Sequence, residues 1–133
     1  MSEKIVLLTR DQIMAAQDIK TEVVDVPAWG GAVMVRSMTG KQRDAFEESL
    51  QVKSKGKTTV SLQQFRAKLV SWTVVDADGK RVFSESDVAW LGEKSAASLT
   101  RVAEVASRLS GISENDAEEM IKNSEADQGE SSG

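Results

Sequence analysis

Residues 21–50 constrain the fold of this chain more than any other segment. A β-branched run ends at Pro27, a turn rich in glycine follows, and extended-chain residues then resume. Thr39 comes next and is of a residue type that commonly caps the start of a helix. The segment therefore predicts a β-hairpin over residues 21–37 and a helix over residues 40–51. The apolar face of that helix is expected to carry Ala45, Phe46 and Leu50.

Apolar spacing and turn residues predict the other elements. A helix over residues 61–73 has a continuous apolar stripe that is expected to be the main wall of the core, formed by Leu62, Phe65, Leu69 and Trp72. The composition of residues 53–57, KSKGK, predicts a loop. A short helix after Thr9 is expected to be a lid or an arm. The remaining predicted elements are a hairpin over 74–83, a short helix after Ser84, and helices over 94–110 and 114–123.

These elements predict an α+β fold, with small antiparallel β-hairpins or one small sheet packed against several helices. A chain of 133 residues suits a single compact domain, which we place at residues 1–123. Residues 111–133 contain seven of the 21 acidic side chains but only one of the 17 basic ones. We therefore predict an acidic, disordered tail over residues 124–133. The apolar run over residues 5–8 is too short for a signal peptide or a membrane span.

The composition removes most catalytic chemistry. The chain contains no cysteine, no histidine and no tyrosine. Thiol nucleophiles, Cys/His zinc sites and imidazole acid–base catalysis are thereby excluded. We predict no catalytic, metal-binding or cofactor-binding residue, and a protein that is not an enzyme.

Two short motifs resemble ligand-binding loops but lack essential positions. Residues 56–58, GKT, match the end of a phosphate-binding loop, yet Gln51 stands where that loop needs its first glycine. Residues 76–79, DADG, match the start of a calcium loop, yet Lys80 stands at the next ligand position. We interpret the first as a solvated basic loop and the second as the tight turn of a hairpin.

The aromatic residues divide by position. Most of them fall on apolar stripes or strands and are expected to lie in the core: Phe46, Phe65, Trp72, Phe83 and Trp90. Trp29 instead lies at the tip of a glycine-rich turn, where its ring either folds back over the body or is presented to a partner. Met34 and Met38 are candidates to extend such a partner-binding surface, although strand residues facing the core explain them equally well.

Two blocks of the sequence, VDVPAWGGAVMVRSMTGKQRDAFEESL and VVDADGKRVFSESDVAWLGEKSAASLTRVAEVASRLSGISENDAEEMIKNSEAD, resemble the tail assembly chaperones of long-tailed, siphovirus-type bacteriophages. The similarity rests on a strand ending in proline, a WGG turn, a VxVR strand and a TGxxRDxFE helix. It continues with a DxDGKxxF hairpin and an alanine-rich helix that closes on LSG. Together the blocks cover about residues 9–127. None of these motifs is catalytic, so their order and spacing carry the resemblance.

The resemblance implies a function in phage assembly. It implies a protein that binds the tape measure protein in the host cytoplasm, supports polymerisation of the tail tube and is absent from the mature virion. It also implies contact with tail tube protein, through a frameshift-extended form, and we expect weak self-association. Two alternatives stay open: a tail or connector subunit incorporated in the virion, and a small regulatory nucleic-acid binder, which the acidic composition disfavours.

Overall fold

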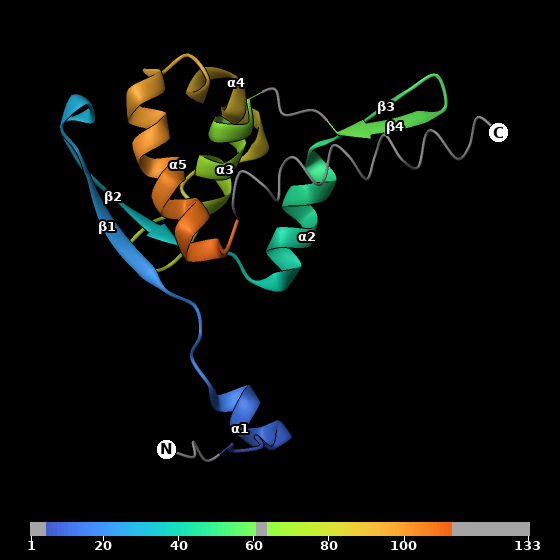
Figure 1. Cartoon of the computed structure of the whole chain (residues 1–133). Coiled ribbons are helices and arrows are strands. Elements are labelled where there is room, and N and C mark those ends of the chain that lie inside the picture. Colours follow the sequence, from blue (N-terminus) through green and yellow to red (C-terminus); the bar gives the residue numbers. More distant parts are fainter. Residues whose placement is uncertain (1–4, 61–63, 113–133) are drawn as a thin grey trace.

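The computed structural model describes residues 5–60 and 64–112. A three-stranded antiparallel sheet has the strand order β1 (Thr21–Val26), β2 (Gly31–Arg36) and β5 (Val74–Val75). Helix α5 (Ala96–Ser110) packs across one of its faces (Figure 1). No helix within residues 5–60 and 64–112 covers the other face of the sheet. The predicted α+β class is confirmed. The other two longer helices of the described residues are α2 (Gly40–Ser49) and α3 (Phe65–Thr73).

The β1–β2 hairpin forms as predicted. Its strands pair in a register that places Val24 opposite Val33, so alternate residues face α5. The tip is a 3₁₀ turn, η1 (Pro27–Trp29), followed by Gly30 with a φ of 83°. That left-handed conformation is one that glycine adopts without steric cost. The inward-facing and buried side chains are Val24, Val26 and Val35.

Gly30→Ala is expected to lower the free energy of unfolding by roughly 1 kcal/mol, because a Cβ disfavours the left-handed conformation even where no atom obstructs it. Gly40→Ala is the matched control, since that site is equally open and its φ lies outside the left-handed region. We expect the control to be neutral or slightly stabilising. Urea denaturation of both variants checks the difference, and equal losses would contradict the conformational explanation.

Helix α3 lies at the centre of the core. It contacts α2, α4 (Val88–Leu91) and α5, and Leu69 and Val70 are fully buried. The predicted stripe is confirmed at Leu69, whereas Phe65 and Trp72 are only half-buried at the edge of the core. Leu62 lies outside the described residues. Neighbouring helices surround α3, so its buried residues include the polar Ser71 and Thr73. Both hydroxyls are hydrogen-bonded within the helix: Ser71 Oγ donates to Lys68 O at 2.7 Å, and Thr73 Oγ1 donates to Leu69 O at 2.7 Å.

Helix α2 begins at the predicted cap, and α5 lies within the helix predicted over residues 94–110. Thr39 caps α2, because its Oγ1 accepts the backbone N–H of Gln42 at 3.0 Å. Ser95 caps α5, and Gly111 ends that helix in the left-handed conformation, with a φ of 70°. An exposed ion pair between Arg108 and Glu22, at 2.7 Å, joins α5 to β1.

The prediction of a loop over residues 53–57 is wrong. The segment forms a separate two-stranded antiparallel hairpin, β3 (Gln51–Ser54) and β4 (Lys57–Val60), which projects away from the helices (Figure 1). Lys55 and Gly56 form its tip with φ values of 53° and 75°. Two consecutive left-handed residues make the kind of turn whose twist matches that of paired strands. The threonines and valines that flank the lysines favour extended chain.

The second predicted hairpin forms, but its returning strand is reduced. Val75 pairs with Arg81 in an isolated bridge, and Asp76 Oδ1 accepts the backbone N–H groups of Asp78 and Lys80 at 2.8 and 3.0 Å. This carboxylate therefore closes the turn, which leaves the tight-turn interpretation of the DADG motif in place. The 3₁₀ turn η2 (Glu85–Asp87) then leads into α4.

Three predictions concern residues that the structure does not describe. The helix over 114–123, the tail over 124–133 and the domain boundary at residue 123 all lie outside the described ranges. Within those ranges, no helix has the length and apolarity needed to cross a bilayer.

Candidate interaction surface

The most exposed apolar side chains belong to an N-terminal arm, which we define as residues 5–19. The arm contains α1 (Arg10–Ala15) and stands apart from the body, joined to β1 by a single stretch of chain (Figure 1). Thr9 caps α1 in a reciprocal arrangement: its Oγ1 accepts the N–H of Gln12, and Gln12 Oε1 accepts the N–H of Thr9 at 2.9 Å. The predicted short helix after Thr9 is confirmed, and it lies outside the core as expected.

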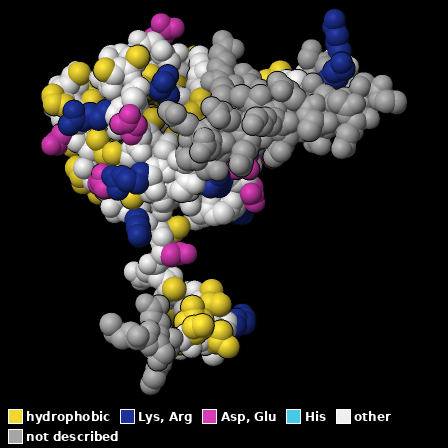
Figure 2. Space-filling view, in the orientation of Figure 1, with side chains coloured by type: hydrophobic (Ala, Val, Ile, Leu, Met, Phe, Trp, Pro, Cys, Tyr) yellow, Lys and Arg dark blue, Asp and Glu magenta, His cyan; other side chains and the backbone are white. Residues whose placement is uncertain are grey.

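None of the side chains of α1 is buried. Ile13 is 60% exposed, Met14 is 65% exposed and Leu7 is 87% exposed. Figure 2 shows hydrophobic side chains gathered on this arm, apart from those of the body. Contiguous apolar surface of this kind is rare on soluble monomers and commonly marks a contact site. The exposed apolar residues of the arm are Ile5, Val6, Leu7, Leu8, Ile13 and Met14.

An open cavity of about 570 Å³ lies where the arm meets the sheet. The root of the arm forms one wall, and the outer face of the sheet together with the turn after β5 forms the others. Arg36 Nη1 donates to Gly79 O at 3.2 Å and so ties β2 to that turn. Met34 and Val75, which pair across β2 and β5, form an apolar part of the cavity wall. The lining of the cavity is mixed, because charged side chains lie beside this apolar part: Asp18, Arg36 and Asp78.

A smaller exposed patch lies at α4. Trp90 is 46% exposed, so its predicted place in the core is wrong. Its ring packs edge-on against Phe83 at 5.7 Å, and its Nε1 donates to Asp87 Oδ1 at 2.8 Å. Val88 and Leu91 lie one turn apart and take the inward face, which leaves Trp90 on the outside. A partly exposed tryptophan with a satisfied N–H is typical of contact surfaces.

The ionisable groups near α4 have structural explanations. Hydrogen bonds from the backbone N–H of Ser84 and from the Trp90 indole lower the pKa of Asp87. Burial over the Trp72 ring, with the guanidinium carbon 3.9 Å from the ring centroid, lowers the pKa of Arg81. In the described ranges no three acidic side chains are grouped closely enough to hold a metal ion. The exposed apolar surfaces are therefore the better candidates for a contact site.

A family model described as phage tail assembly chaperone matches residues 9–123. The chain belongs to the phage tail assembly chaperone family. Among solved structures, the tail assembly chaperone of bacteriophage HK97 has a TM-score of 0.52 and 20% sequence identity, over 78% of this chain and 95% of that one. At this identity the likeness concerns the fold. No curated protein sequence matches the chain.

The three predicted partner-binding residues of this chaperone occupy different environments. Trp29 is half-buried and packs against the core, which is the folded-back alternative. Met34 is half-buried on the outer face of β2, beside the cavity. Met38 is only 8% exposed and lies within the core, so it does not extend a surface around Trp29. A contact between Trp29 or Met34 and a partner stays a prediction.

Trp29→Ala is expected to lower the free energy of unfolding by roughly 2 kcal/mol, because the ring is half-buried and a fully buried aromatic truncation costs about 3–5 kcal/mol. The folded-back position of the ring predicts that partner binding changes little. Thermal melting and a pull-down check the two expectations. An unchanged melting temperature together with lost binding would instead make Trp29 a partner anchor.

The arm of the chaperone is only weakly indicated by the residues that form it. Residues 5–8 were too short for a membrane segment, and that length test says nothing about a contact surface. The informative signal is an apolar run followed by a capped helix that is too short to be stable on its own. Trp90 could have been placed outside from its spacing, since Val88 and Leu91 already define the buried face of a one-turn helix.

Proposed function

We propose that this chaperone binds the tape measure protein and keeps it soluble until tail tube subunits polymerise around it. The observation that carries the proposal is the N-terminal arm, which holds six exposed apolar side chains clear of the body. Burial of one such side chain contributes about 1.5–3 kcal/mol to association. A few of them suffice for reversible binding of apolar client segments. The Trp90 patch and the cavity at the root of the arm offer further contact area.

The proposed mechanism is non-enzymatic. Binding covers apolar segments of the client, while charged side chains over the rest of the chaperone face water. Release requires only that tube subunits compete for the same client surface. No bond is made or broken in this cycle, and no cofactor is needed.

The remaining expectations from the family resemblance belong to the same proposal. The chaperone acts in the host cytoplasm during assembly and is absent from the mature virion. Contact with tail tube protein, through a frameshift-extended form, places tube subunits next to the coated tape measure. Weak self-association allows several copies to coat one long client, and sedimentation at increasing concentration tests that element.

Co-expression tests the proposal. Tape measure protein is produced alone, with this chaperone, and with an unrelated acidic protein of similar size as the control. We expect the soluble fraction to rise only with the chaperone, and the two proteins to co-purify. An insoluble tape measure protein under all three conditions would contradict the proposal.

Mass spectrometry of purified virions distinguishes a chaperone from the main alternative, a tail or connector subunit incorporated in the virion. A chaperone should be missing from the virion or present only in traces. Stoichiometric recovery would make the chain a tail or connector subunit instead.

A further inference from the structure

The β3–β4 hairpin is the most basic part of the described chain. Lys53, Lys55 and Lys57 are all exposed, and residues 51–60 contain no acidic side chain. None of the three lysines forms an ion pair with another described residue. The hairpin therefore presents a small surface of uncompensated positive charge on an acidic protein.

Among residues 5–60 and 64–112, no other strand pairs with the hairpin. It projects from the end of α2 (Figure 1). Val52 in β3 is exposed although it is a β-branched apolar residue. An isolated two-stranded hairpin is at best marginally stable in water. The positive charge of the hairpin and the exposed Val52 both favour the binding of a further segment to it.

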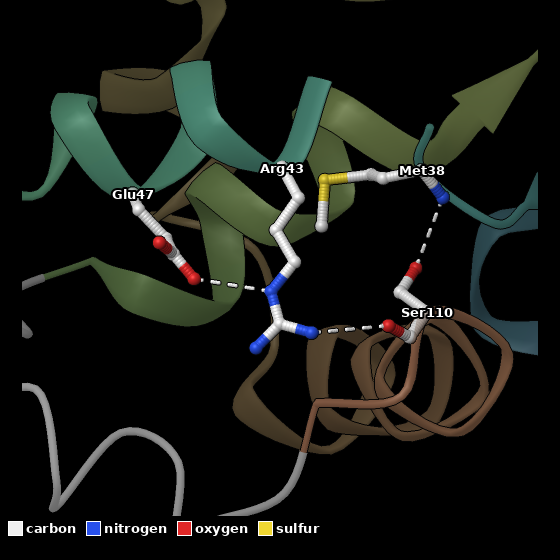
Figure 3. Close-up of polar contacts among 4 residues, drawn as sticks. All are labelled: Met38, Arg43, Glu47 and Ser110. Carbon is white, nitrogen blue, oxygen red and sulfur yellow. Dashed lines mark hydrogen bonds and ion pairs between the residues drawn. The ribbon is translucent and has the colours of Figure 1, made fainter. Parts of the chain in front are cut away.

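The described chain ends beside the start of α2, the helix whose other end leads into this hairpin. Ile112 is buried, and its N–H donates to Ser107 O at 2.8 Å, which fixes the chain just after α5. Ser110 contacts two residues at the start of α2: its Oγ accepts the N–H of Met38 at 3.2 Å, and its carbonyl accepts Arg43 Nη1 at 3.5 Å (Figure 3). Ile112, the last described residue before the C-terminal segment, therefore lies two positions after a residue that contacts the start of α2.

Helix α2 leads directly into the hairpin. Arg43 and Leu50 are separated by about 10 Å of helix at 1.5 Å per residue. A segment as long as residues 113–133 spans roughly 30 Å even if it is entirely helical, and more if it is extended. The C-terminal segment is thus long enough to reach the lysines from its starting point.

We propose that the acidic C-terminal segment, residues 113–133, docks on the basic β3–β4 hairpin of its own chain. The segment carries seven acidic side chains and one lysine, so its charge complements that of the hairpin. Single ion pairs at a surface are weak and are screened by salt. A tether at Ile112 raises the effective concentration of the segment at the hairpin, which favours this occupant over a second copy or a separate polyanion. The contact does not depend on the proposed client.

Nuclear magnetic resonance on the full chain tests the contact. The chain has no cysteine, so Ser124→Cys accepts a single nitroxide label. At low salt we expect strong broadening of the amide signals of Val52, Lys55 and Gly56. The broadening should fall by more than half at about 1 M salt, where the screening length is about 3 Å. It should fall similarly when Lys53→Gln, Lys55→Asn and Lys57→Gln are combined; asparagine tolerates the left-handed conformation at the tip.

Controls distinguish docking from simple proximity. Neutralising three exposed lysines elsewhere, Lys20, Lys80 and Lys94, to glutamine should leave the broadening unchanged. Broadening that resists both salt and removal of the hairpin lysines, or no broadening at all, would overturn the proposal. Broadening of an unlabelled, isotope-enriched chain mixed with labelled chain would assign the contact to a second copy and overturn the intramolecular version. Hairpin signals that shift with added duplex DNA but show no label-dependent broadening would assign the surface to nucleic acid instead.

Discussion

Leu69→Asp is expected to leave the chain unfolded at ordinary temperature. Leu69 has no exposed surface and lies in α3, where α2, α4 and α5 meet. Removing a buried leucine side chain costs about 2–5 kcal/mol, and an unpaired buried carboxylate adds several more. A domain of this size has about 5–15 kcal/mol of stability, so the substitution removes most or all of it. Far-ultraviolet circular dichroism with a thermal melt measures the loss.

Leu7→Asp is the matched control for that variant. The exchange of side chains is identical, but Leu7 is almost fully exposed in the N-terminal arm. Surface substitutions usually change stability by about 0.5 kcal/mol or less. A cooperative melt close to that of the wild type is therefore expected for Leu7→Asp. The same melt in Leu69→Asp would contradict the central position of α3.

Local signals in the sequence were sufficient for most of the fold. The β1–β2 hairpin and helices α2 and α5 each have their own turn or capping residues, such as Thr39, Ser95 and Gly111. Such residues act within a few positions of their own place in the chain, so they can be recognised without tertiary information. The α+β class followed from the order of these elements.

The errors arose where tertiary packing or turn geometry decides the outcome. Lys55 adopts the left-handed conformation at the hairpin tip, and a lysine gives little indication of that from sequence. The apolarity of Trp90 favours the core, but a one-turn helix has room for only one buried face, which Val88 and Leu91 occupy. Phe65 and Trp72 are half-buried at the edge of the core. Their burial depends on tertiary packing, which the local sequence does not indicate.

The candidate site was harder to predict than the fold. Apolar side chains usually indicate burial, so Ile13 and Met14 look the same in the sequence whether they face a core or a partner. Only the position of α1, away from the body, shows that they remain exposed. The same ambiguity applies to Met38, which packs in the core although its residue type also suits a contact surface.

Binding of tape measure protein through the N-terminal arm is the central claim, and a double substitution of Ile13→Gln and Met14→Gln tests it most directly. Glutamine is a good helix former, so α1 and its cap should persist while both apolar side chains are lost. The matched control replaces exposed valines outside the arm, Val23→Thr and Val82→Thr.

The decisive measurement is the affinity of purified chaperone for tape measure protein, taken alongside a melting curve for each variant. We expect the arm variant to melt like the wild type and to bind about 100-fold more weakly, the equivalent of about 2.8 kcal/mol spread over two contact side chains. The valine control should bind like the wild type. Wild-type affinity in an arm variant of unchanged stability would contradict the claim that this arm holds the client.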